Sequence, residues 1–139
     1  MTIALRDIPG CFAGEIPPII ATSSAAGEPN VAHLSQVFLV DDQHVATSNQ
    51  FFAKTAANLQ ENPVATLLCV DPADLRTYKL LVRHERTENS GERFDRARRS
   101  IEAVATLTGM EDVFALRAID VFRVLDVSHV PTRGTVDAP

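Results

Sequence analysis

The fold is decided by residues 35–63, which read SQVFLVDDQHVATSNQFFAKTAANLQENP. Two short apolar runs flank the turn signal Asp41-Asp42, and this pattern predicts a β-hairpin. A short helix is predicted after the hairpin. It must end before Pro63, because the residue that precedes a proline disfavours helical geometry. We predict that this helix opens near Asn49 and that one of the two phenylalanines after it packs into the core.

Further strands are predicted on both sides of this stretch, and most of them are linked by hairpins. The expected strands are residues 18–23, a run that resumes at residue 31, and residues 37–40, 44–47, 65–70, 78–88 and 118–127. Six or so mostly antiparallel strands with inserted helices favour an antiparallel barrel over a doubly wound sheet. In the last strand one apolar face is expected, interrupted by Arg123; its members are Ile119, Val121, Leu125 and Val127.

A second, longer helix is predicted over residues 92–108. Its apolar residues recur at helical spacing, and they are Phe94, Ala97, Ile101, Val104, Ala105 and Thr108. Gly109 is a natural left-handed stop. The opposite face is basic, with Arg93, Arg96, Arg98 and Arg99. An anion-binding patch is one interpretation, but we favour a solvated face whose arginines pair with Glu92, Asp95 and Glu102.

Composition limits the class of protein. The chain has 139 residues, 45% of them apolar, and we expect one domain over residues 1–130 and a mobile tail over residues 131–139. A formal net charge of −5 argues against a general nucleic-acid binder. No apolar run is long enough to span a membrane, and no secretory signal precedes the first strand. We therefore expect a cytoplasmic protein with no membrane partner.

Cysteines and histidines show no metal-binding pattern. Cys11 and Cys69 are far apart in sequence, so we expect two reduced thiols, with Cys69 inside an apolar strand. The four histidines have neither HxxxH nor HExxH spacing, and we expect no metal site.

The region around Asn49 is a candidate phosphate site. The chain has neither GxGxxG nor GxxxxGK[ST], so the commonest nucleotide-binding loops are absent. A helix that opens near Asn49 would present free backbone N–H groups, to which Thr47, Ser48 and Thr55 add neutral donors. Lys54 supplies a full positive charge. The alternative is that Asn49 only caps the helix and Lys54 is solvated, and spacing alone leaves both open.

Several short segments follow one another in an order that carries a resemblance. They are IAT (20–22), GEPNV (27–31), LSQV (34–37), VD (40–41), HVA (44–46), FFAKT (51–55) and NLQENP (58–63). Together they resemble the pyridoxamine 5′-phosphate oxidase-like family, over about residues 17–127. The resemblance implies an FMN-binding split β-barrel and a homodimer with the flavin at the subunit interface.

The resemblance also assigns residues to the phosphate of FMN. Lys54 and Thr55 match the basic pair that holds this phosphate in the family, while Ser48 and Asn49 match the strand end that adds hydroxyl and backbone contacts. One departure is Thr55, which replaces the second basic residue. Another lies in residues 31–36, which lack the arginine and lysine that family oxidases carry there.

Other residues are assigned to the flavin ring. Ser35, Gln36 and the backbone of Val37 match the strand alongside the isoalloxazine. Arg76 and Thr77 match the region that reaches the flavin from the partner chain.

The function that these assignments imply is an FMN-dependent oxidoreductase. It would pass electrons between a reduced nicotinamide, or another small-molecule donor, and an acceptor that the sequence does not identify. Oxidation of pyridoxamine phosphate itself is not expected, because the chain lacks the family's C-terminal arginine and histidine motif. Two alternatives stay open: a non-catalytic flavin-binding or ligand-binding sensor, and a slot for a deazaflavin or haem. No catalytic residue is assigned.

Overall fold

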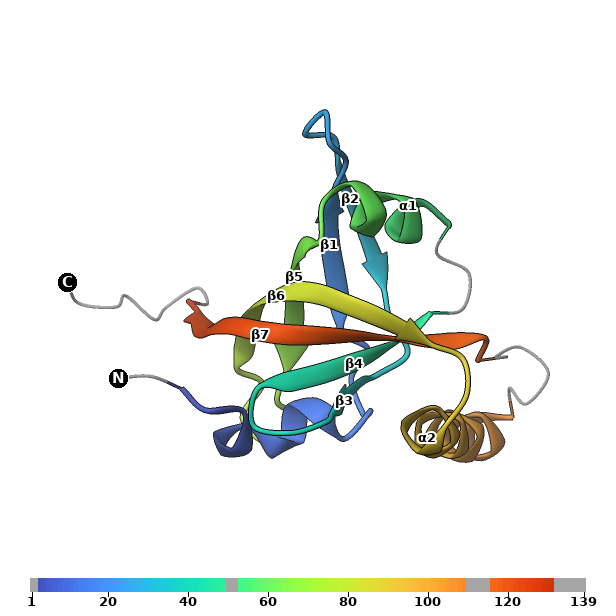
Figure 1. The fold of residues 1–139 in the computed structure, drawn as a ribbon. Coiled ribbons are helices and arrows are strands. Elements are labelled where there is room, and N and C mark those ends of the chain that lie inside the picture. Colours follow the sequence, from blue (N-terminus) through green and yellow to red (C-terminus); the bar gives the residue numbers. More distant parts are fainter. Residues whose placement is uncertain (1–2, 50–52, 110–115, 132–139) are drawn as a thin grey trace.

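A computed structural model describes residues 3–49, 53–109 and 116–131. Seven strands form one antiparallel sheet in the order β2-β1-β5-β6-β7-β4-β3. The sheet curls into a split barrel, in which β1, β2 and β5 rise across the direction of β4, β6 and β7 (Figure 1). The predicted fold class, mainly β with inserted helices in a split-barrel arrangement, is confirmed.

The elements agree closely with the predicted ones. The strands are β1 (Ile19–Ser23), β2 (Pro29–His33), β3 (Val37–Leu39), β4 (His44–Asn49), β5 (Val64–Val70), β6 (Thr77–Glu88) and β7 (Ala118–Val130). The helices are α1 (Ala53–Glu61) and α2 (Glu92–Thr108), and two 3-10 turns precede the first strand, η1 (Leu5–Asp7) and η2 (Pro9–Phe12). Gly109 ends α2 in the left-handed conformation, as predicted. Within the described residues, no helix is both long and apolar enough to cross a membrane.

The core has two parts, one on each face of the sheet. Inside the barrel lie fully buried side chains from several strands, among them Val37, Val45, Leu67, Leu80, Val82 and Phe122. On the outer face, α2 packs against the sheet through Phe94, Ala97, Ala46, Ile119 and Val121. Successive side chains of a strand point to opposite faces. Strand β4 and the first half of β7 are therefore buried on both faces, because one side lines the barrel and the other meets α2.

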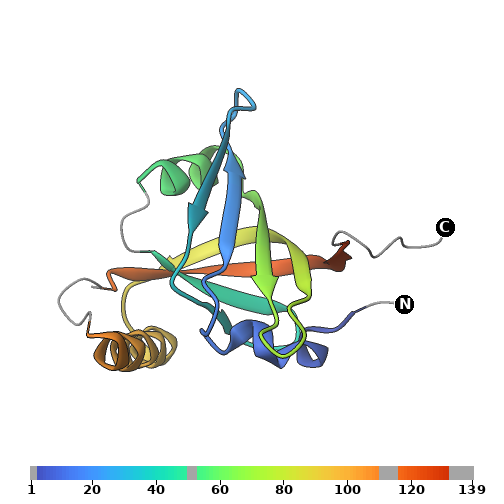
Figure 2. The same cartoon turned by 180° about the vertical axis from the view of Figure 1, so that it is seen from behind.

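Helix α1 lies beside the β1–β2 hairpin (Figure 2). Polar contacts join the two. Asn58 Nδ2 donates a 3.1 Å hydrogen bond to Thr22 Oγ1, and both residues are buried. At the far end of the helix, Glu61 Oε2 accepts a 3.0 Å hydrogen bond from the backbone N–H of Ala25. Leu59 is the one buried apolar side chain of α1. The hydrogen bonds therefore determine how the helix packs on the hairpin.

The helix does not begin at Asn49. Asn49 is the last residue of β4 and pairs with Ala118 of β7, whereas Ala53 is the first helical residue described. The antiparallel ladder between β4 and β7 continues further than the sequence indicated, so the backbone of Asn49 belongs to the sheet. The expectation for Phe51 and Phe52 lies outside the described residues, as does that for the tail beyond residue 131.

A bulge in β7 corrects the prediction for its apolar face. The ladder to β6 steps from the pair Val82–Val124 to the pair Leu81–Asp126, so Leu125 is the extra residue. Leu125 is 48% exposed rather than buried. The extra residue also exchanges the two faces of the strand beyond it.

The bulge separates residues that were expected to share a face. Val127 packs against the barrel core, whereas Ile119 and Val121 belong to the core under α2. The prediction assumed unbroken alternation along the strand, and it is wrong beyond Arg123.

Candidate functional site

The end of β4 carries the polar residues that the sequence assigns to a phosphate. Thr47 and Ser48 are each 1% exposed, and Asn49 is half-buried. Thr47 lies opposite Asp120 of β7, on the face that lines the barrel. By alternation, Asn49 shares that face and Ser48 points to the opposite one. The strand therefore presents donors on two faces rather than as a single row.

Ser48 is the most informative of these residues. Its hydroxyl oxygen is buried, and among the described residues it has no hydrogen-bond partner. Ser48 lies opposite Ile119, on the side of the sheet that α2 covers. A buried hydroxyl without a partner costs roughly 1–3 kcal/mol, so native proteins retain one where something else bonds to it.

Lys54 and Thr55 stand at the start of α1 and both contact the β1–β2 hairpin. Lys54 Nζ lies 2.7 Å from Glu28 Oε1, and both side chains are more than half exposed. The hydrogen bond and the charge of Lys54 hold the pKa of Glu28 below its usual range. Thr55 is buried, and its Oγ1 accepts a 3.4 Å hydrogen bond from Asn30 Nδ2. The predicted phosphate cation is thus paired with a carboxylate in this structure.

The residues assigned to the flavin ring lie just before and at the start of β3. Gln36 is buried, and its amide joins two distant elements: Nε2 donates to Phe12 O at 3.0 Å, and Oε1 accepts from Ser100 Oγ at 3.1 Å. Ser35 is half-buried and Val37 fully buried. The amide of Gln36 is therefore engaged in holding η2 and α2 against the sheet.

Strand β3 forms one edge of the sheet, with β4 as its only neighbouring strand among the described residues. Alternate N–H and C=O groups on the outer side of an edge strand have no ladder partner. They match the donors and acceptors on the pyrimidine edge of a flavin. The backbone of β3, rather than the Gln36 amide, is the part of this segment suited to contact such a ring.

Arg76 and Thr77 lie at the opposite end of the sheet. Thr77 pairs with Val130 at the far end of β7, whereas Asn49 pairs with Ala118 at its beginning. Arg76 is largely exposed, 3.6 Å from Asp74. Within one chain, then, the structure does not bring these two residues to the end of β4.

A groove of about 240 Å³ runs between β3 and the first turns of α2. Its lining is apolar along the sheet and charged along the helix: Phe38, Leu39, Val40, Ala46, Ala97 and Ile119, with Glu92, Arg93 and Arg96. Ala46 and Ile119 are also the residues next to Ser48, along β4 and across the ladder. The groove thus leads toward the unpartnered hydroxyl. Sequence reasoning did not identify it, because its walls are distant in the chain.

The basic face of α2 is mostly paired locally. Arg96 lies 3.3 Å from Glu92 and Arg98 lies 3.6 Å from Asp95, which agrees with the solvated interpretation. Arg93 differs, because its partner is Glu88 at the end of β6, at 3.1 Å.

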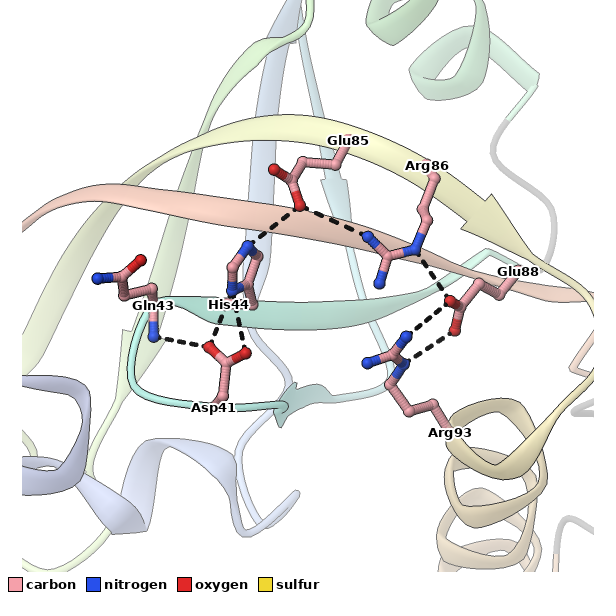
Figure 3. Close-up of polar contacts among 7 residues, drawn as sticks. All are labelled: Asp41, Gln43, His44, Glu85, Arg86, Glu88 and Arg93. Carbon is pink, nitrogen blue, oxygen red and sulfur yellow. Dashed lines mark hydrogen bonds and ion pairs between the residues drawn. The ribbon is translucent and has the colours of Figure 1, made fainter.

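A surface network extends from Arg93 across the sheet to the β3–β4 turn (Figure 3). Its members are Asp41, His44, Glu85, Arg86, Glu88 and Arg93. His44 lies between two carboxylates, with Nδ1 2.8 Å from Asp41 Oδ1 and Nε2 3.1 Å from Glu85 Oε1. The hydrogen bonds from Arg93 and then Arg86 lower the pKa of Glu88. These contacts tie both walls of the groove to β6.

A second polar cluster lies on the barrel side of the same strands. His84 Nε2 is 2.9 Å from Asp120 Oδ1, and Thr87 Oγ1 donates a 2.6 Å hydrogen bond to the same oxygen. The His84 ring also meets the edge of Phe122, with centroids 5.3 Å apart. No spacing rule predicts this cluster, since 36 residues separate histidine from aspartate. Among the described residues, no group of three or more His, Cys, Asp or Glu is placed to hold a metal.

These residues are compatible with a flavin phosphate at the end of β4. Thr47, Ser48 and Thr55 are hydroxyl donors, and the Ser48 hydroxyl lacks a partner among the described residues. Lys54 is paired, but an exposed ion pair contributes only about 0–1 kcal/mol. A phosphate can therefore replace Glu28 at Lys54 without a large penalty.

Comparison with known sequences identifies one matching protein family. A family model for pyridoxamine 5′-phosphate oxidase matches residues 12–127. No curated protein sequence gives a significant match.

Solved structures with the same fold include proteins named for different ligands. An FMN-binding protein from Syntrophomonas wolfei subsp. wolfei has a TM-score of 0.75 and 20% identity, over 91% of this chain and 84% of that one. HutZ, the haem storage protein of Vibrio cholerae, has a TM-score of 0.58 and 16% identity, over 93% and 95%. An F420 reductase has a TM-score of 0.57 and 16% identity, over 85% and 93%. At these identities the likeness concerns the fold.

Proposed function

Because the chain belongs to the pyridoxamine 5′-phosphate oxidase family, we propose that it binds FMN and acts as a flavin-dependent oxidoreductase. The observation that carries the proposal is the buried Ser48 hydroxyl, which has no partner among the described residues and is adjacent to Ala46 and Ile119 of the groove lining. FMN, when bound, supplies the redox chemistry, and the protein orients it and tunes its surroundings.

Each part of the cofactor has a counterpart in this proposal. Ser48 provides a neutral donor for the phosphate from the face of β4 that α2 covers, and Thr55 and Lys54 provide a hydroxyl and the charge from the start of α1. The side chains of Thr47 and Asn49 lie on the barrel-lining face, so they contribute through the backbone of the strand end. The groove between β3 and α2 provides an apolar surface for the ring. The edge of β3, including the backbone of Val37, provides hydrogen-bond partners for the pyrimidine edge.

A homodimer is part of the proposal, because Arg76 and Thr77 lie at the wrong end of the sheet to contact a flavin in their own chain. If they contact one, it is that of a second copy. Dilution should then release FMN together with subunit dissociation, and Arg76→Ala should speed both. Flavin that stays bound to an isolated monomer would contradict the shared site.

A ligand-binding role without catalysis is the second candidate, supported by the fold similarity to a haem storage protein. The two candidates differ in one observable. An oxidoreductase must let a donor reduce its flavin, whereas a storage or sensor module need not.

The test is a set of fluorescence and absorbance titrations of the apo-protein with FMN, riboflavin, F420 and haem, followed by anaerobic addition of NADH or NADPH. We expect FMN to bind more tightly than riboflavin, and the donor to bleach the flavin band. Bound FMN that neither donor reduces would favour the ligand-binding role. Tighter binding of F420 or haem than of FMN would identify that compound, rather than FMN, as the cofactor.

Ser48→Ala tests the observation that carries the proposal. It should reduce the preference for FMN over riboflavin by about tenfold, as expected for one lost hydrogen bond to a charged group. Ser23→Ala is the matched control, since Ser23 is a half-buried serine on β1, opposite Pro29 of β2, and its hydroxyl donates to the backbone carbonyl of Ser24. Equal losses in both variants would reject Ser48 as a phosphate contact.

A further inference from the structure

Strand β5 is apolar on both of its faces, although the described part of the chain covers only one of them. Ala65, Leu67 and Cys69 point into the barrel and are buried. The alternate residues point outward and are partly exposed: Val64, Thr66, Leu68 and Val70. A strand whose outer face meets water alternates apolar with polar residues, whereas a strand that is apolar on both faces is covered on both. The composition of β5 therefore indicates a cover on its outer side.

The apolar outer side continues across the strands that neighbour β5. Residues directly opposite each other in an antiparallel ladder share a face. Two rows of outward residues cross the sheet, and they are Val31–Ala21–Thr66–Leu81 and Ile19–Leu68. We call these six residues the outer apolar face. Val31, on β2, is 65% exposed, and the other five are partly exposed.

Neither helix covers the outer apolar face. Helix α2 packs on the outer side of the sheet elsewhere, against Ala46 of β4 and against Ile119 and Val121 in the first half of β7. Helix α1 bonds to Thr22 of β1, whose side chain is buried on the barrel side. Figure 2 looks onto β1, β2 and β5, and no helix lies in front of these strands. Within the described residues, this face is thus open.

The rim of the outer apolar face carries charges of both signs. On the same side of the sheet, β6 contributes Lys79 and Arg83, and β7 contributes Arg123 and Asp126. All four are exposed, and among the described residues none of them has an ion-pair partner. A two-fold interface brings the same patch of two chains together. A patch with unpaired cations and an unpaired carboxylate around an apolar centre can therefore pair with a copy of itself.

The turn that joins β5 to β6, at one end of this face, holds a strained and exposed residue. Leu75 has a positive φ of 59° and is 67% exposed. This geometry is unfavourable for a residue that has a side chain. Two bonds hold the turn in it, from Leu75 N–H to Asp71 O at 2.8 Å and from Arg76 N–H to Asp74 Oδ1 at 2.9 Å. Strained residues cluster at functional contacts, so an exposed leucine held in this way indicates a contact outside its own chain.

We propose that the outer apolar face docks against the same face of a second copy of this chain, and that Leu75 contacts that copy. The inference rests on the proposed function for the shared flavin site, and it deepens that function by naming the surface that forms the dimer. Thr77 lies on the same side of the sheet, opposite Val70, and Arg76 precedes it. Docking through this surface brings both residues to the partner.

The test measures the dimer dissociation constant of the full chain by sedimentation velocity over a series of dilutions, first without FMN. Val31→Glu should raise this constant by about tenfold or more, because docking would bury a carboxylate against apolar residues. The fold of the monomer should not change, because Val31 is largely exposed. Leu107→Glu is the matched control, since it adds the same charge at an 87% exposed leucine of α2.

Two further variants test the rim and the turn. Asp126→Lys should raise the dissociation constant by about tenfold, because the rim would then hold cations alone. Glu102→Lys, which makes the same change of charge on the exposed side of α2, should leave it unchanged. Leu75→Asn should weaken the dimer by about three- to tenfold without lowering the melting temperature of the monomer, because asparagine tolerates the left-handed geometry.

The outcomes separate the inference from the proposed function. Equal dissociation constants for Val31→Glu and Leu107→Glu, with FMN still bound, would overturn the inference and leave the function standing. A wild-type chain that stays monomeric at every concentration, or that cosediments with anionic lipid vesicles instead of dimerising, would also overturn it. A dimer that Val31→Glu disrupts but that binds no FMN would support the docking surface, and the proposed function would fail.

Discussion

Ser100 Oγ donates a 3.1 Å hydrogen bond to Gln36 Oε1, and this bond joins the middle of α2 to the segment before β3. The other end of the same amide donates to Phe12 O of η2. One buried side chain therefore connects three elements that are far apart in sequence. A residue that the family resemblance assigned to the flavin also holds the scaffold together.

Gln36→Ala should lower the free energy of unfolding by about 1–3 kcal/mol, because it removes two hydrogen bonds and leaves the partly buried carbonyl of Phe12 without this donor. Urea unfolding measures this change. Gln60→Ala on the exposed side of α1 is the matched control and should stay within about 0.5 kcal/mol of wild type. A similar midpoint in both variants would show that the Gln36 amide does not stabilise the fold.

Gly14→Ala should be more destabilising than Gly27→Ala. Both glycines have positive φ, 78° and 83°, so alanine is strained at either position by about 1–2 kcal/mol. A Cβ at Gly14 would in addition lie 2.8 Å from Gln36 Oε1, whereas at Gly27 nothing described lies within 4 Å. The difference in thermal stability between the two variants measures the effect of crowding between the new Cβ and Gln36. Equal loss in both would mean that the Gln36 side chain moves aside freely.

Lys54→Ala should weaken FMN binding by about 1–3 kcal/mol, the value of a charge-assisted hydrogen bond, with little effect on riboflavin. Glu28→Gln should strengthen FMN binding, because it frees Lys54 from the carboxylate that lies 2.7 Å away. Fluorescence titration measures both. Arg6→Ala, which removes an exposed arginine of η1, is the control for net charge. Unchanged FMN affinity in Lys54→Ala would remove Lys54 from the phosphate site.

The thiols of Cys11 and Cys69 should stay unreactive in the folded protein. Burial raises the pKa of each to about 12, with Asp71 adding to the effect at Cys11 and Cys11 adding to it at Cys69. A chromogenic disulfide reagent at about pH 8 should therefore label neither thiol until denaturant is added. Rapid labelling of the native protein would contradict the buried placement.

The same pKa shifts imply a loss of stability in alkali. A group whose pKa is raised on folding stabilises the protein below its unfolded pKa, and this contribution is lost as the pH rises toward the folded pKa. For these thiols the loss should begin near pH 9 and continue toward pH 12. Unfolding midpoints in this range should fall less steeply in the double variant Cys11→Ala/Cys69→Ala. If the unfolding midpoints of the wild type and the double variant fall equally steeply with pH, groups other than these two thiols cause the loss of stability in alkali.

The sequence by itself determined the order of strands and helices. The 3.6-residue spacing defined α2 to its last residue, and Gly109 marked its end, because local geometry depends on near neighbours along the chain. It also predicted two thiols that are not joined to each other, with Cys69 inside an apolar strand, and the structure agrees: both cysteines are free and Cys69 is buried in β5. The polar residues grouped around Asn49 could also be identified from the sequence, because they are near neighbours along the chain.

Only the tertiary structure decided how those residues are used. The bulge at Leu125 reversed the faces of β7, and the pairing of His84 with Asp120 joined two strands that no spacing rule relates. The bonds of the Gln36 amide to Phe12 and Ser100 likewise depend on partners 24 and 64 residues away. Hydrogen-bond partners and the faces of a bulged strand depend on residues that are distant in sequence, so local patterns cannot specify them.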